Sequence, residues 1–179
     1  MKDAGVDQYK ARTDRANLRY FLAGFLRQEE HHGFCCQALA LINAVRWHGR
    51  ATPELSGDFW MKILSLAHCR ARDSTEEEVQ AVADYLGVRR RHIELTPESV
   101  HKNLPAMVYL QNKYDYVHVG LIVGHIDGVY YIANYRGHIG TETVSERRWE
   151  DIKFMPGHDY AHQVIEVRHG TETHMEAPA

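Results

Sequence analysis

The chain has 179 residues, of which 44% are hydrophobic and 25% charged, and its formal net charge at pH 7 is −3. This length suits one domain with a substantial core, and the lack of a basic excess argues against nucleic acid as a partner. No apolar run approaches the roughly 18 residues of a membrane span, and the first twenty residues lack the apolar stretch of a secretory signal. We therefore expect one domain over residues 1–179, with a core of about 28–168 and flexible ends at 1–8 and 170–179. We also expect a cytoplasmic location without membrane insertion, although delivery by another route stays open.

The cysteine count indicates free thiols. The chain has three cysteines, Cys35, Cys36 and Cys69, and the first two are adjacent. Neighbouring cysteines rarely bridge each other, and an odd count leaves at least one thiol unpaired. We therefore expect reduced thiols in a reducing compartment rather than a disulfide framework.

Hydrophobic periodicity predicts helices first and strands afterwards. The expected helices cover 9–27, 36–47, 56–69 and 75–86, and glycines follow the second and the fourth. The expected strands cover 105–110, 116–124, 129–134 and 163–168. The basic run "RRRH" (89–92), which follows a helix end, is expected to be a solvated turn. This order of elements predicts an α+β fold, with an N-terminal helical half packed on a C-terminal antiparallel sheet.

The two middle strands are predicted to form a hairpin, because Asp127-Gly128 is a strong two-residue turn signal. His118 stands near the start of the first strand, and Asn134 closes the second. A two-residue turn would place Asn134 opposite Leu121 rather than beside His118. Contact between the two therefore requires a bulge, a strong twist or another register.

A cysteine at the mouth of the apolar helix 36–47 gives this hairpin a chemical partner. A helix N-terminus favours negative charge and lowers a thiol pKa, and an adjacent imidazole does the same. An amide oxygen that binds the other ring nitrogen orients the imidazole. Cysteine, histidine and asparagine in this chain order are what nucleophilic acyl transfer requires.

With these motifs the chain resembles the papain-like cysteine peptidases. The spacing of His118, Gly124, Asn134 and Gly137 matches the papain hairpin without a gap. The segments "CCQALALINAVRWHG", "VQAVADYLG" and "LPAMVYL" then follow the order seen in the double-glycine leader (bacteriocin-processing) peptidases and their stand-alone relatives. The resemblance runs from about residue 28 to residue 149. It departs at Asn134, where that branch usually has Asp, and after the cysteine, where the usual Gly is absent.

The resemblance implies a peptidase that cleaves a peptide or isopeptide bond through a covalent acyl-enzyme. Its catalytic residues would be Cys36, His118 and Asn134, and Gln28 would donate to the oxyanion hole. It implies a peptide or protein substrate, no cofactor, and a bacterial or phage source, and it leaves the oligomeric state open.

The adjacent Cys35 remains an alternative nucleophile. Asn43 and Gly49 lie seven and thirteen residues after Cys36, the spacings typical of the family. The "GFC" run and the position of Gln28, in contrast, fit Cys35 slightly better. We favour Cys36.

Three other readings compete with a peptidase. The same triad also serves acyltransferases and deamidases, and the fold also occurs as an inactive binding or structural module. "HHGFCC" offers His31, His32, Cys35 and Cys36 as zinc ligands, with Cys69 further along. Adjacent cysteines cannot easily place both sulfurs on one tetrahedral ion, so we expect no metal site.

Overall fold

The computed structural model describes residues 24–29, 32–112, 114–135 and 143–167. Most of the helix predicted over 9–27 lies outside these residues, and so do Gly137 and both ends predicted to be flexible.

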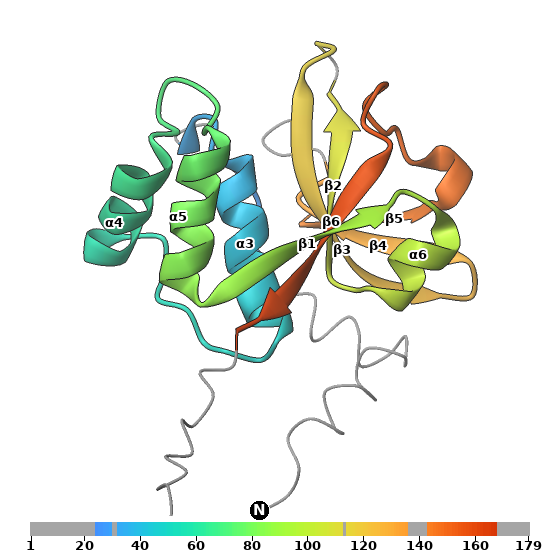
Figure 1. Ribbon diagram of the computed structural model, residues 1–179, viewed down its shortest axis with the longest axis horizontal. Coiled ribbons are helices and arrows are strands. Elements are labelled where there is room, and N and C mark those ends of the chain that lie inside the picture. The colour runs from blue at the N-terminus through green and yellow to red at the C-terminus, as the bar shows by residue number, and fades with distance from the viewer. Residues whose placement is uncertain (1–23, 30–31, 113, 136–142, 168–179) are drawn as a thin grey trace, which may run out of the picture.

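The fold is α+β, as predicted, and is built on a six-stranded antiparallel sheet in the order β1-β6-β2-β3-β4-β5. The helices are α3 (Cys36–Trp47), α4 (Gly57–Ala67), α5 (Glu76–Leu86) and α6 (Pro97–Lys102), with a 3-10 turn η3 (Trp149–Asp151). The strands are β1 (Val88–Glu94), β2 (Ala106–Gln111), β3 (Val117–Ile126), β4 (Val129–Ala133), β5 (Val144–Arg148) and β6 (Tyr160–Glu166). Helices α3, α4 and α5 gather on one side of the sheet (Figure 1). Within the described residues, no helix combines the length and the apolar character needed to cross a membrane.

The central strand β2 is buried on both faces, and this explains its continuous apolar run. Met107 and Tyr109 belong to the core that α3, α4 and α5 form over one face. Val108 and Leu110 belong to a second core on the other face, which Val100 of α6 and Ile152 cover. The sheet therefore separates two cores, and α3 packs chiefly on β3.

The predicted helix ends follow from their capping residues. Thr75 and Glu78 form a reciprocal capping box at the start of α5, and Gly87 ends that helix with φ +68°. Gly49, with φ +83°, follows α3 in the same way. These predictions are confirmed because each depends on contacts within a few residues of chain.

The prediction of a solvated turn at "RRRH" is wrong, because residues 89–92 lie inside β1 and pair with β6. The strand is held by burial of Val88 and Ile93 at its two ends. The Arg90 side chain is only 4% exposed and forms an ion pair with Glu76 of α5. Three consecutive arginines hid the strand pattern, and the short elements α6 and β5 also escaped prediction.

A bulge in β3 sets the register of the hairpin. Beyond the turn, Ile126 pairs with Val129 as a two-residue loop requires, but the register shifts by one between Ile122 and Gly124. Leu121 consequently pairs with Ala133, so Asn134 advances one position towards His118. The carbonyl of the bulged residue, Val123, accepts a hydrogen bond of 2.8 Å from the Trp47 indole at the end of α3.

Trp47→Phe removes the indole N–H and leaves the carbonyl of the fully buried Val123 without this hydrogen bond. We expect the free energy of unfolding, measured by urea denaturation, to fall by about 1–3 kcal/mol. The matched control is Trp60→Phe. Trp60 lies in α4 and packs edge-on against His32, so the same substitution there does not affect the Val123 carbonyl. An equal loss in both variants would contradict a specific role for the bond to Val123.

Candidate functional site

Cys36 is the first residue of α3, and its side chain is buried against β3. Backbone hydrogen bonds from Val119, Gln37 and Cys36 itself reach the sulfur. Val119 directly follows His118 on β3. The structure therefore brings the Cys36 sulfur to the backbone of the residue next to His118.

The thiol of Cys36 is held in its protonated form. Burial raises its pKa to about 11, and the negative charge of Asp73 adds to this rise. The backbone hydrogen bonds at the helix mouth act in the opposite direction but are the smaller effect. The sequence analysis expected the helix N-terminus to lower this pKa. The backbone hydrogen bonds do lower it, but burial, which the sequence analysis did not include, raises it by more.

His118 meets Asn134 through the backbone of the asparagine. Nε2 of the ring lies 2.6 Å from the Asn134 carbonyl oxygen. A carbonyl can only accept, so Nε2 carries the hydrogen in this contact, and Nδ1 is the ring nitrogen at which protonation changes the charge. Asn134 has φ +58°, a left-handed conformation that asparagine tolerates better than most residues.

The Asn134 side chain has a different partner. Its Oδ1 accepts a 2.9 Å hydrogen bond from the backbone N–H of Gln28, whose own Nε2 donates to the Gly33 carbonyl. Gln28 Oε1 and Asn134 Nδ2 are both buried, and neither has a hydrogen-bond partner among the described residues. In this structure Asn134 therefore ties Gln28 to the end of β4, while its backbone holds the His118 ring.

Gly120 permits this close approach. A Cβ at this position would lie 2.8 Å from Leu110 Cδ1 and 3.3 Å from the Ala133 carbonyl oxygen. The sequence pattern did not predict this contact, because it depends on the bulge. A side chain here would push against the end of β4, directly before Asn134.

The expectation of reduced cysteines is wrong for two of the three, because Cys35 forms a disulfide with Cys69. Cys36 is the free cysteine. The partners lie 34 residues apart and are brought together by tertiary packing, in which the Phe34 N–H donates to the Cys69 carbonyl over 2.8 Å. Disulfides persist mainly in oxidising compartments, so a cytoplasmic location no longer follows from the cysteine count and stays a prediction.

The bridge also bears on the two other uses considered for these cysteines. In the bridged form the Cys35 sulfur is neither a nucleophile nor a metal ligand. His32, from the same segment, accepts a hydrogen bond at Nδ1 from the Glu29 N–H. Among the residues that the structure describes, which exclude His31, no three His, Cys, Asp or Glu side chains gather to hold a metal ion.

Comparison with known proteins establishes the fold. No protein-family model and no curated protein sequence matches the chain. A crystal structure of a double-glycine motif protease from an AMS/PCAT transporter, in complex with the leader peptide, is 13% identical over 79% of this chain and 90% of that one, with a TM-score of 0.55. The peptidase domain of Streptococcus ComA, a bifunctional ABC transporter of a quorum-sensing pathway, is 12% identical over 79% and 98%, with a TM-score of 0.59.

The chain therefore has the papain-like α+β fold of these peptidase domains, and the resemblance inferred from its sequence is confirmed for the fold.

Substitutions at Asn134 test the tie to Gln28. Asn134→Gly removes the acceptor and leaves the Gln28 N–H without its partner, so we expect stability to urea to fall by about 1–3 kcal/mol. Asn134→Ala loses the same bond and, unlike glycine, keeps a Cβ at positive φ without the tolerance of asparagine for this conformation, so it should be about 1–2 kcal/mol less stable than Asn134→Gly. Equal stability of Asn134→Gly and the wild type would contradict the tie.

The disulfide predicts a specific count of thiols. Alkylation of the unfolded protein without reductant should modify one cysteine, Cys36, and reduction beforehand should expose all three. The double variant Cys35→Ser/Cys69→Ser should lose roughly 2–4 kcal/mol of stability, with Cys36→Ser as the control that keeps the bridge. Three reactive thiols in the unreduced protein would show that the bridge is absent.

Proposed function

We propose that this protein is a cysteine peptidase, with Cys36 as nucleophile, His118 as general base and acid, and Asn134 as the residue that positions the ring. The observation that carries the proposal is the meeting of the first residue of α3 with the start of β3. The Cys36 sulfur lies against the backbone of Val119, and the preceding His118 is bound through Nε2 to Asn134.

The raised pKa of Cys36 favours proton transfer during attack over a preformed thiolate. His118 Nδ1 takes the proton from the sulfur as the sulfur bonds to the carbonyl carbon of the substrate. The resulting imidazolium is stabilised at Nε2 by the Asn134 carbonyl. Nδ1 then gives its proton to the leaving amine as the C–N bond breaks.

The acyl-enzyme formed in this way is a thioester on Cys36. Water attacks it, His118 again accepts a proton, and the thiol is released with the acid product. An amine or alcohol acceptor in place of water would give an acyltransferase, and a primary-amide substrate would give a deamidase, with no change in the triad.

Two groups are available to stabilise the oxyanion. The backbone N–H of Cys36 belongs to the first turn of α3, where N–H groups have no acceptor within the helix. The Gln28 side chain donates to the Gly33 carbonyl in this structure, so it would have to exchange that acceptor for the oxyanion. A single donor of this kind contributes about 10²–10³ in rate.

Peptides with a double-glycine motif are the first substrates to test, because both structural neighbours are peptidase domains and one is a double-glycine motif protease bound to a leader peptide. A fluorogenic peptide that ends in Gly-Gly-aminomethylcoumarin should release coumarin with the wild type. Cys36→Ser and His118→Ala should each reduce kcat/KM by more than about 10³-fold, since either change removes a group that takes part in bond breaking.

The matched control is His125→Ala, because His125 is another histidine of β3, placed near its far end and in contact with His101. This variant should keep full activity. If a thioester accumulates on Cys36 and is cleaved by added amines but not by water, the chain is an acyltransferase. An intact substrate, together with an unreactive Cys36, would mean that the chain is an inactive module with this fold.

A further inference from the structure

Two histidines from different elements meet on the side of the sheet that α6 covers. His101 lies in the last turn of α6, and His125 lies near the end of β3. Their Nδ1 atoms are 2.8 Å apart, and their ring centroids are 4.5 Å apart. This pair lies outside residues 31–36, whose histidines and cysteines the sequence analysis considered as metal ligands, and the proposed peptidase mechanism does not use it.

Packing holds the two rings in this arrangement. The His125 ring contacts that of Tyr130, with centroids 4.4 Å apart, and the Tyr130 hydroxyl donates to the Pro97 carbonyl at the start of α6 over 3.3 Å. Val100, which directly precedes His101, is fully buried in the core beneath α6. His101 itself is exposed, and His125 is half-buried. The pair is therefore preorganised and accessible to an ion from solvent.

The contact between the rings depends on a single proton. A neutral imidazole has one N–H and one lone pair, so one Nδ1 atom donates in this contact and the other accepts. If the donating ring instead carries its hydrogen on Nε2, both Nδ1 atoms present a lone pair to the same region. This change of tautomer needs only exchange with water, which the partial exposure of both rings allows. Two nitrogen ligands are then available to one cation, at a point beside the line that joins them.

The separation of the two nitrogens favours one class of metal ion. Metal–imidazole bonds are about 2.0–2.1 Å long, so nitrogens 2.8 Å apart enclose an angle of roughly 85–90° at the metal. This angle separates neighbouring ligands in square-planar and octahedral ions. A tetrahedral ion, with angles of about 109°, would need nitrogens roughly 3.3–3.4 Å apart. Ni²⁺ and Cu²⁺ prefer the first arrangement, and Zn²⁺ prefers the second.

The charges around the pair have both signs. Lys102, the next residue after His101, is in an ion pair within α6. Arg91 reaches the end of α6 from β1, and its charge opposes a bound cation, whereas Asp127, two residues after His125, favours one. All three charged residues are exposed, so solvent screens their effects. The two coordination bonds therefore decide the affinity.

We propose that His101 and His125 form a binding site for a divalent transition-metal ion of the Ni²⁺ and Cu²⁺ class. The two Nδ1 atoms are the protein ligands, and water fills the remaining positions. The site needs no third side chain, in agreement with the lack of any three-ligand group among the described residues. A bound ion ties α6 to β3, and it does so whether or not the chain is a peptidase.

Isothermal titration calorimetry of the unreduced full chain with Ni²⁺ measures the affinity of this site. His101→Asn and His125→Asn each remove one imidazole ligand, while the amide can still form a hydrogen bond with the remaining ring. Each variant should weaken the tightest Ni²⁺ binding by at least about tenfold. An unchanged affinity in either variant overturns the proposal.

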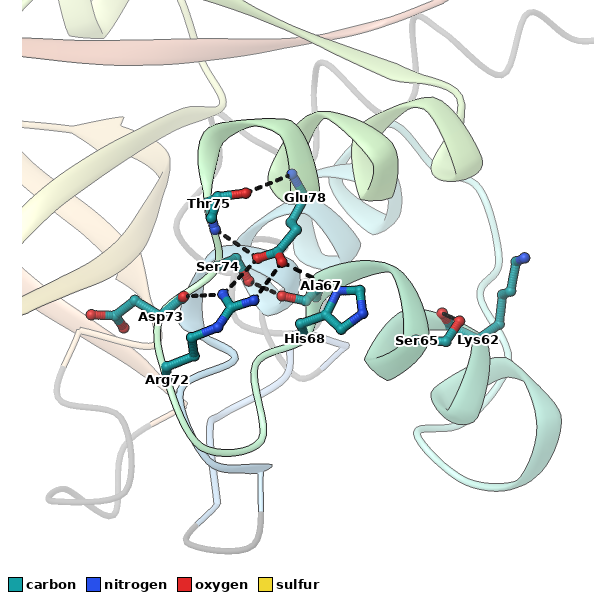
Figure 2. A network of polar contacts seen from close by, with 9 residues as sticks. All are labelled: Lys62, Ser65, Ala67, His68, Arg72, Asp73, Ser74, Thr75 and Glu78. Carbon is teal, nitrogen blue, oxygen red and sulfur yellow. Dashed lines mark hydrogen bonds and ion pairs between the residues drawn. The ribbon is translucent and has the colours of Figure 1, made fainter.

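His68→Asn is the matched control, because His68 is also exposed and its Nδ1 lies 3.2 Å from Oε1 of Glu78. Figure 2 shows that this carboxylate is already bound by Arg72 and by the backbone N–H of Thr75, so it is not free to share a metal ion. Asparagine also suits the left-handed conformation of His68, with φ +48°. The Ni²⁺ affinity of this variant should equal that of the wild type.

Thermal unfolding tests whether one ion binds both rings. Because the two ligands come from elements that separate on unfolding, Ni²⁺ should raise the Tm of the wild type and of His68→Asn, and EDTA should reverse the rise. The rise should be lost in His101→Asn and in His125→Asn. A wild-type Tm that Ni²⁺ does not raise overturns the proposal. Tighter binding of Zn²⁺ than of Ni²⁺ to the wild type overturns the right-angle geometry and the class of ion assigned from it.

Discussion

The hydrogen bond from the Trp47 indole to the Val123 carbonyl joins the helical half of the molecule to the sheet at the bulge of β3. The geometry of the candidate site depends on this bulge. Trp47 ends α3, and Cys36 begins it. Val123 lies at the bulge of β3, and the bulge helps to bring Asn134, the residue after β4, towards His118. One contact thus fixes the far end of the helix against the same strand whose register brings His118 and Asn134 together.

Burial and reactivity oppose each other at Cys36. A buried sulfur is well positioned, but a low-dielectric environment disfavours its thiolate, and the pKa rises to about 11. The helix mouth and the Val119 backbone offset only part of this effect. If Cys36 is the nucleophile, as we propose, this environment favours loss of its proton to His118 at the moment of attack over a preformed thiolate.

The Cys35–Cys69 bridge gives the helical half its own anchor. It joins the residue before the α3 N-terminus to the loop that leads into α5. The opposite end of that loop is held by the Thr75–Glu78 capping box and by Arg72, whose hydrogen bonds lower the pKa of Glu78 to about 2. Local capping and a long-range covalent bond therefore act on the same loop, residues 68–75, and together they hold it beside the start of α3.

The sequence by itself determined the features that depend on neighbouring residues. Helices α3 and α5 were predicted closely because their ends are set by Gly49, Thr75 and Gly87, and the β3–β4 hairpin was predicted because Asp127-Gly128 defines its turn. The order of helices and strands was enough for the α+β class, and the spacing and order of short motifs were enough for the papain-like resemblance. Both agree with the fold of the structural neighbours.

Tertiary structure decided the rest, because it depends on contacts between residues far apart in the chain. The bulge at Val123 is supported by Trp47 from another element, so the turn alone predicted a register one residue away from the observed one. The strand β1 exists because β6 pairs with it, although its arginines suggest a turn. Cys35 and Cys69 are 34 residues apart, and the burial that sets the pKa of Cys36 comes from the sheet packed against α3. Neither the distance between residues far apart in the chain nor the burial of a side chain can be predicted from its neighbours in the sequence. The chemistry of this site therefore follows from the packing of the whole domain.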